Sequence, residues 1–137
     1  MTDTPKEHRL ELPSNTKYIH QVEDFFQTVN KSYGLPEDKF YSLLVAVTEA
    51  VNNGIIHGNE NDESKKVTIT CTKTDGAITI RVRDEGEGFT PGDIADPLQE
   101  ENLLRTGGRG VFLMKSFMRS VSYNEQGNEV TMVMDIG

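Results

Sequence analysis

The stretch at residues 49–58 reads Glu-Ala-Val-Asn-Asn-Gly-Ile-Ile-His-Gly. It completes a helix predicted from about Glu37 to His57, whose apolar residues form one stripe at helical spacing: Phe40, Leu44, Val47, Val51 and Ile55. Glu49, Asn53 and His57 follow one another at intervals of four residues, so they share the polar face opposite this stripe. Residues 41–64 contain no Lys or Arg.

This polar face allows two interpretations. The first is a solvated helix surface with no chemical role. The second is a cation site, because the carboxylate of Glu49 and the amide of Asn53 both present oxygen atoms. Mg²⁺ typically takes one or two protein oxygens together with substrate phosphates, so these two side chains would suffice. His57 has no second histidine or other ligand nearby in sequence, and we assign it a structural role.

The sequence before and after this helix predicts alternating helices and strands. A short strand at residues 8–12 precedes a helix that begins at Ser14 or Asn15 and ends near Tyr33. After residue 58 the predicted elements are strands at 66–73 and 77–84 around Asp75-Gly76, an aperiodic stretch at 86–108, a helix at 109–118, and a hairpin of 120–124 with 129–136. This order predicts an α/β two-layer sandwich, with a mixed, mostly antiparallel sheet and helices on one face.

Length and composition exclude several classes of protein. The 137 residues predict one domain spanning residues 1–137, with its own core. With 14 Lys and Arg against 22 Asp and Glu, the net charge is −8, which argues against nucleic-acid binding and against an anionic membrane surface. The longest apolar run is residues 43–47, far below the ~20 residues of a spanning helix. Cys71 has no partner for an internal disulfide, and we expect a cytoplasmic protein.

Asp84 is the second candidate functional residue. It continues the alternation of Ile78, Ile80 and Val82, which would point its carboxylate toward the core. A buried carboxylate without partners is costly. Either the strand ends at Arg83 and Asp84 turns outward, or a group such as the exocyclic amine of a purine donates hydrogen bonds to it. The next glycines, at positions 86 and 88, allow a flat ligand to approach the backbone closely.

A third motif, Gly107-Gly108-Arg109-Gly110, directly precedes the predicted helix at 109–118. Backbone N–H groups in a glycine-rich loop at a helix N-terminus bind anions, and Arg105 and Arg109 add positive charge. The alternative is a flexible loop before a helix. No Gly-x-x-x-x-Gly-Lys-Ser/Thr sequence is present, so the motif is not a P-loop.

In this order the three motifs resemble those of the GHKL ATPase superfamily, which has the Bergerat ATP-binding fold. Residues 49–58, 83–89 (Arg-Asp-Glu-Gly-Glu-Gly-Phe) and 105–114 (Arg-Thr-Gly-Gly-Arg-Gly-Val-Phe-Leu-Met) are most similar to the bacterial anti-sigma factor serine kinases. The resemblance covers nearly the whole chain. It implies a single histidine-kinase-like ATPase domain whose lid spans about residues 89–107.

The resemblance also implies roles for individual residues. Glu49 would be the general base toward a Ser or Thr hydroxyl or a water, and Asn53 would coordinate Mg²⁺. Asp84 would accept the adenine amine beside Gly86 and Gly88. Arg105 would neutralise charge on the γ-phosphate, and the phosphates would contact Thr106, Gly107, Gly108, Arg109, Gly110 and Val111. Asn128 stands where the family often has Thr in a late adenine contact.

The function that the resemblance implies is a Ser/Thr protein kinase that is also an anti-sigma factor. Its partners would be a sigma factor and a STAS-type antagonist, which it would phosphorylate. The alternative is a nucleotide-gated interaction module without kinase activity. A two-component histidine kinase is disfavoured because neither His8 nor His20 lies on a dimerising helical hairpin. The aromatic residues Phe25, Phe26 and Tyr33 fit either a homodimer face or ordinary core packing, and we favour the homodimer.

Overall fold

The computed structural model describes residues 7–74, 76–86, 117–125 and 127–135. The predicted lid at 89–107 lies outside the described residues, and so does the predicted helix at 109–118 apart from its last two positions. The elements follow in this order: β1 (Glu7–Pro13), η1 (Thr16–Tyr18), α1 (His20–Tyr33), α2 (Glu37–Asn53), η2 (Gly54–Gly58), β2 (Lys66–Thr74), β3 (Ala77–Arg83), β4 (Ser120–Tyr123) and β5 (Glu129–Asp135).

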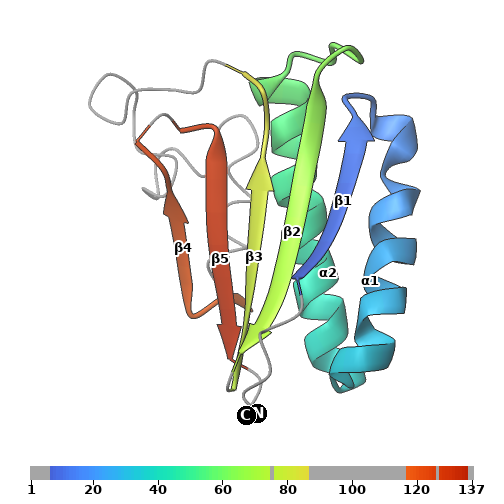
Figure 1. The fold of residues 1–137 in the computed structure, drawn as a ribbon, viewed down its shortest axis with the longest axis vertical. Coiled ribbons are helices and arrows are strands. Elements are labelled where there is room, and N and C mark those ends of the chain that lie inside the picture. The colour runs from blue at the N-terminus through green and yellow to red at the C-terminus, as the bar shows by residue number, and fades with distance from the viewer. Residues whose placement is uncertain (1–6, 75, 87–116, 126, 136–137) are drawn as a thin grey trace.

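The strands form one five-stranded sheet in the order β1-β2-β3-β5-β4. Helices α1 and α2 cover one face of it, which confirms the predicted two-layer sandwich (Figure 1). Every pairing among the described strands is antiparallel, so the parallel component of the predicted mixed sheet is absent from this part of the chain. The short connections from β2 to β3 and from β4 to β5 favour this result, because a parallel pair needs a long crossover.

The core lies between the sheet and the two helices. Val67, Ile69 and Cys71 share the buried face of β2, and on that face Ile69 and Cys71 lie beside Val82 and Ile80 of β3. These two residues in turn lie beside Val130 and Met132 of β5. Full burial of an apolar side chain of this size contributes about 1.5–3 kcal/mol. The core residues that the helices supply include Val22, Phe26, Val29, Leu43, Val47 and Val51.

The first helix differs from the prediction at its start, and its aromatic residues are buried to different degrees. Asn15 caps only the short η1, by accepting a hydrogen bond from the Lys17 N–H, and the α-helix begins later, at His20. Phe26 is 2% exposed, while Phe25 and Tyr33 are partly buried against the core. Core packing is therefore confirmed for Phe26, whereas a dimer face that includes the accessible parts of Phe25 and Tyr33 stays a prediction.

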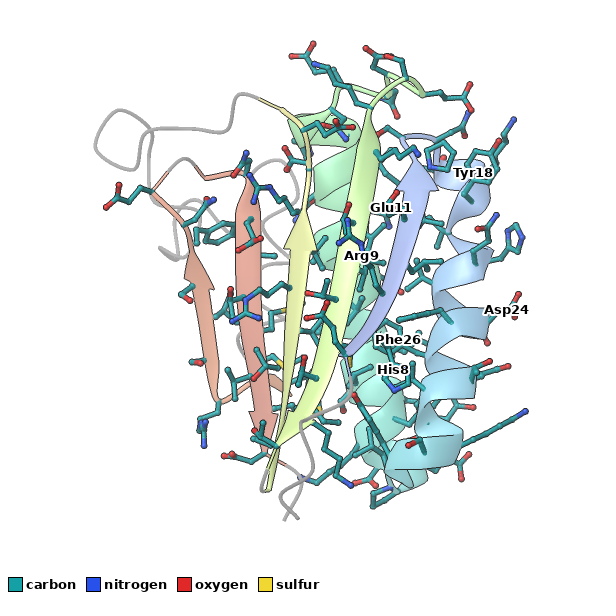
Figure 2. The ribbon with its side chains drawn as sticks, viewed as in Figure 1. His8, Arg9, Glu11, Tyr18, Asp24 and Phe26 are labelled. Atoms are coloured by element: carbon teal, nitrogen blue, oxygen red, sulfur yellow. The ribbon has the colours of Figure 1, made fainter. Side chains whose placement is uncertain are left out.

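The other face of the sheet is not covered by α1 or α2 (Figure 1), and polar side chains line it, among them Thr68, Thr70 and Arg81. Arg9 and Glu11 project from it (Figure 2) and form an ion pair with a 2.8 Å Nη2–Oε1 distance. Both side chains are well exposed to water, so this ion pair contributes little to stability. Across the part of the chain that the structure describes, no helix has both the length and the apolar character needed to cross a membrane.

Candidate nucleotide site

The end of α2 widens into the π-turn η2, in which the backbone N–H of Asn59 donates to the carbonyl of Gly54 at 2.8 Å. A π-turn takes one more residue than an α-turn and often marks a functional site. It interrupts the α-helical spacing after Asn53. Glu49 and Asn53 are half-buried, whereas His57 is exposed, so the predicted row of three polar residues stops at Asn53. The structural role assigned to His57 is not supported by core packing.

Three glycines bring the end of α2 against the turn that follows β3. A Cβ atom on Gly58 would lie 2.4 Å from the Cγ of Asp84, and one on Gly86 would lie 2.1 Å from the carbonyl oxygen of Gly58. A Cβ atom on Gly54 would meet the Asp84 Cβ at 3.6 Å, an ordinary contact. Gly58 and Gly86 thus have no room for a side chain. The structure therefore brings the residue after Asn53 into contact with Asp84, as a shared site requires.

The turn at residues 84–86 is held by its own backbone. Strand β3 ends at Arg83, as the first alternative for Asp84 expects, but the Asp84 side chain does not turn outward: it is half-buried against Gly58. The N–H of Asp84 donates to the carbonyl of Asn128 at 2.9 Å, and the N–H of Gly86 donates to the Asp84 Oδ1 at 2.8 Å. Among the described residues, no hydrogen bond reaches the second carboxylate oxygen, Oδ2. That oxygen is therefore free, within the described ranges, to accept a hydrogen bond.

Burial raises the pKa of the Asp84 carboxyl above its ordinary value. The Gly86 N–H and the charges of Arg83 and Lys65 act in the opposite direction. A half-buried carboxylate with a free oxygen gains from a ligand that donates a hydrogen bond to it, because the donor replaces lost water. An exocyclic amine has this property.

Replacing Asp84 with Asn is expected to raise the free energy of unfolding of the ligand-free protein at pH 7. Because the pKa of Asp84 is raised on folding, the folded chain binds more protons than the unfolded chain. Wild-type stability therefore declines as pH rises from about 4 through the folded pKa. The Asn variant therefore exceeds wild type in free energy of unfolding by the full amount above that pKa, and the difference shrinks toward pH 4. Urea denaturation between pH 4.5 and 8 measures it.

Asp62→Asn is the control for the Asp84 prediction. The Ser64 hydroxyl and N–H both donate to the Asp62 carboxylate and lower its pKa. This exposed carboxylate favours the folded state when it is ionised, so its Asn variant should lose stability at pH 7. A higher free energy of unfolding in both variants would show a general effect of reduced negative charge. It would contradict the explanation that burial of the Asp84 carboxylate causes the effect.

Asn53 is suited to hold a divalent cation, with the Glu49 carboxylate one turn before it on α2. Among the described residues, neither side chain has a hydrogen-bond or ion-pair partner, although both are half-buried. Both lie on α2 one turn apart, and their carboxylate and amide oxygens are hard donors of the type that Mg²⁺ takes. The Asn53 amide oxygen therefore fits Mg²⁺ together with the phosphates of a nucleotide, and the neighbouring Glu49 carboxylate is left free to accept a proton.

Other predicted site residues lie outside the described part of the chain: Gly88, Arg105, Thr106, Gly107, Gly108, Arg109, Gly110 and Val111. The structure adds Asn59, which the sequence reasoning missed, and it gives Asn128 a structural task. Asn128 holds Asp84 through its carbonyl, and its own N–H donates to the Asn124 side chain at 3.0 Å. The only sequence signal for these residues is an amide side chain beside a turn.

Comparison with known families identifies the fold that carries this site. A family model described as the histidine kinase-like ATPase domain matches residues 12–134. The chain belongs to this family. The match spans the helix with Asn53 and the turn with Asp84, so the histidine kinase-like ATPase assignment covers both halves of the site described above.

Three similar proteins place this histidine kinase-like ATPase domain more closely. It is 38% identical over 104 residues to an anti-sigma F factor of Oceanobacillus iheyensis, which covers 72% of this chain and 71% of that protein. It is 29% identical over 141 residues to the serine-protein kinase RsbW of Staphylococcus epidermidis, which covers 97% and 89%. The crystal structure of RsbU and RsbW domains from Mycobacterium tuberculosis matches 94% of this chain with a TM-score of 0.66. That match is 13% identical and spans 31% of the longer chain, so it shows the fold alone.

Proposed function

We propose that this protein is an ATP-dependent serine/threonine kinase that acts as an anti-sigma factor in a partner-switching pathway. The observation that carries the proposal is the contact between the end of the Asn53-bearing helix and the Asp84 turn, through Gly54, Gly58 and Gly86. This contact joins a cation-binding helix face to an acceptor for an amine. The relatives named anti-sigma F factor and serine-protein kinase support the regulatory role.

In the proposed reaction, a Ser or Thr hydroxyl oxygen of the partner attacks the γ-phosphorus of ATP in line. The bond from that phosphorus to the bridging oxygen breaks, ADP leaves, and Glu49 accepts the hydroxyl proton. Asp84 holds the adenine amine, and Asn53 holds the cation. Bound Mg²⁺ supplies charge neutralisation between the phosphate oxygens. The proposal assigns to Arg105 the neutralisation of charge on the γ-phosphate and to residues 106–111 the binding of the phosphates.

The proposal extends to partners and location. We propose a STAS-type antagonist as the phosphorylated protein, a sigma factor as the second partner, and a cytoplasmic location. We further propose that residues 1–137 act as one domain and that two copies form a homodimer. Phe26 is packed in the core and is not available to the dimer, whereas Phe25 and Tyr33 are only partly buried. The net charge of −8 favours protein partners over nucleic acid.

The decisive experiment is a phosphoryl-transfer assay with the purified protein. It is incubated with Mg²⁺, γ-labelled ATP and the STAS-domain protein from the same organism, with a partner whose Ser and Thr acceptors are changed to Ala as control. The kinase proposal expects label on the wild-type partner alone. ATP binding without any labelled partner would instead identify a nucleotide-gated interaction module, and the kinase proposal would be wrong.

A further inference from the structure

Asn59 is a buried polar residue that the proposed chemistry does not use. Its side chain is 1% exposed, in a region where the neighbouring Glu60 and Asn61 point to water. A buried amide without partners is destabilising, so a folded protein keeps one only where its hydrogen bonds are made. The identity of those partners therefore indicates what Asn59 does.

The Asn59 side chain joins three segments that are far apart in the sequence. Its Nδ2 donates to the Ser14 Oγ at 2.8 Å and to the carbonyl oxygen of Lys66 at 3.1 Å. Its Oδ1 accepts from the backbone N–H of Glu85 at 2.8 Å. The bonds to Lys66 and Glu85 would both be lost if the amide were turned around, because oxygen would then face the Lys66 carbonyl oxygen and the amide nitrogen would face the Glu85 N–H group. The partners thus fix the orientation of the amide.

The bond to Glu85 acts on the middle of the turn that carries Asp84. The N–H of Asp84 is held by Asn128 and that of Gly86 by the Asp84 carboxylate itself, so Asn59 supplies the remaining N–H partner of the three. The Glu85 carboxylate also accepts from the backbone N–H of Lys66, but that contact is exposed to water. The Asn59 bond to Glu85 is partly buried, so water competes for it less than for the exposed bond, and it constrains the backbone more strongly.

We propose that Asn59 is a positioning residue for base recognition: it holds the turn at 84–86 so that the Asp84 carboxylate faces the amine of the nucleotide base. This inference rests on the proposed function. It assigns to Asn59 an effect on selectivity as well as on stability. A carboxylate accepts a hydrogen bond from the 6-amino group of adenine, whereas guanine presents an oxygen at that position. If the Asp84 carboxylate is no longer held in place, the protein should therefore discriminate less between ATP and GTP.

The test compares Asn59→Ala with Ser14→Ala. Ser14 is fully buried and lies on the far side of the same amide, so its variant removes a partner of Asn59 while leaving the bond to Glu85 in place. Both variants should melt at lower temperature than wild type. Calorimetric titrations with ATP and GTP, well below either melting temperature, should show about a tenfold loss of ATP affinity and a reduced ATP/GTP ratio for Asn59→Ala alone.

A second variant, Asn59→Asp, and a second measurement, amide hydrogen exchange, keep the test conclusive if Asn59→Ala folds poorly or binds nucleotide too weakly to titrate. Asn59→Asp keeps an oxygen for the Glu85 N–H but loses the donors to Ser14 and Lys66, so it should be less stable yet retain the ATP/GTP ratio. Amide hydrogen exchange in the nucleotide-free protein should be about tenfold faster at Glu85 in Asn59→Ala than in Ser14→Ala.

The outcomes separate this inference from the proposed function. A wild-type ATP/GTP ratio and wild-type exchange at Glu85 in Asn59→Ala would overturn the positioning role. Equal losses of selectivity in Asn59→Ala and Ser14→Ala would overturn it too, because they would show a general structural effect. If the wild-type protein binds neither nucleotide, the proposed function itself fails, and the role of Asn59 in base recognition fails with it.

Discussion

Glu49→Ala is expected to abolish phosphoryl transfer while ATP still binds. Glu49 is half-buried on α2, one turn before Asn53, and within the described ranges no cation or donor engages its carboxylate. A carboxylate in this position is free to accept the proton of an attacking hydroxyl. Removal of a general base typically costs about 10²–10⁴ in rate, whereas contacts to the nucleotide remain. Single-turnover transfer rates and ATP dissociation constants measure the two effects separately.

Two further variants make the Glu49 experiment specific. Glu49→Gln preserves the size of the side chain but removes its basicity, so it should be as inactive as Glu49→Ala. Glu23→Ala removes an exposed carboxylate from α1 and should transfer phosphate at the wild-type rate. Wild-type transfer by Glu49→Gln would show that the assignment of the base is wrong. Loss of ATP binding in both Glu49 variants would make Glu49 a binding residue instead.

Asn53→Ala is expected to eliminate the stabilisation that Mg²⁺ and ATP give to the folded protein. A ligand at about 100 times its dissociation constant stabilises by roughly 2.7 kcal/mol. For a domain of this size, that corresponds to a rise in melting temperature of about 5–10 °C. Without the Asn53 amide oxygen, the cation loses its protein ligand on α2, so the shift should disappear. Thermal melts with ATP and Mg²⁺, and with ATP and a chelator, measure it.

Asn52→Ala is the matched control for the Asn53 experiment. Asn52 is the preceding residue on α2, of the same type and also half-buried, but it lies off the face that carries Glu49 and Asn53. Its variant should keep the full Mg²⁺-dependent shift. An equal shift in Asn53→Ala and wild type would exclude Asn53 as the cation ligand. Absence of a shift in the wild type would remove ATP from the proposed function.

The fold was predictable because its signals are local. Alternation of buried and exposed residues in β2 and β3, the apolar stripe of α2, and glycines at turns depend on neighbours within a few positions. Gly34 and Gly76, with φ angles of 66° and 72°, end or turn the chain where the sequence predicts. Glu49 and Asn53 were also accessible from sequence, since their helical spacing places them on one face.

Long-range pairing produced the features that local patterns missed. The π-turn after Asn53 forms where Gly58 packs against Asp84, 26 positions later in the chain. The spacing of apolar and polar residues in 49–58 does not predict this turn. From sequence, Asn59 is indistinguishable from the exposed polar residues that follow a helix. In the structure it is buried, because its hydrogen-bond partners come from residues 14, 66 and 85. Residue types and their spacing thus specify which groups can act. Packing of distant segments specifies how the Asp84 carboxylate is held, because a buried hydrogen bond forms only where the folded chain brings donor and acceptor together.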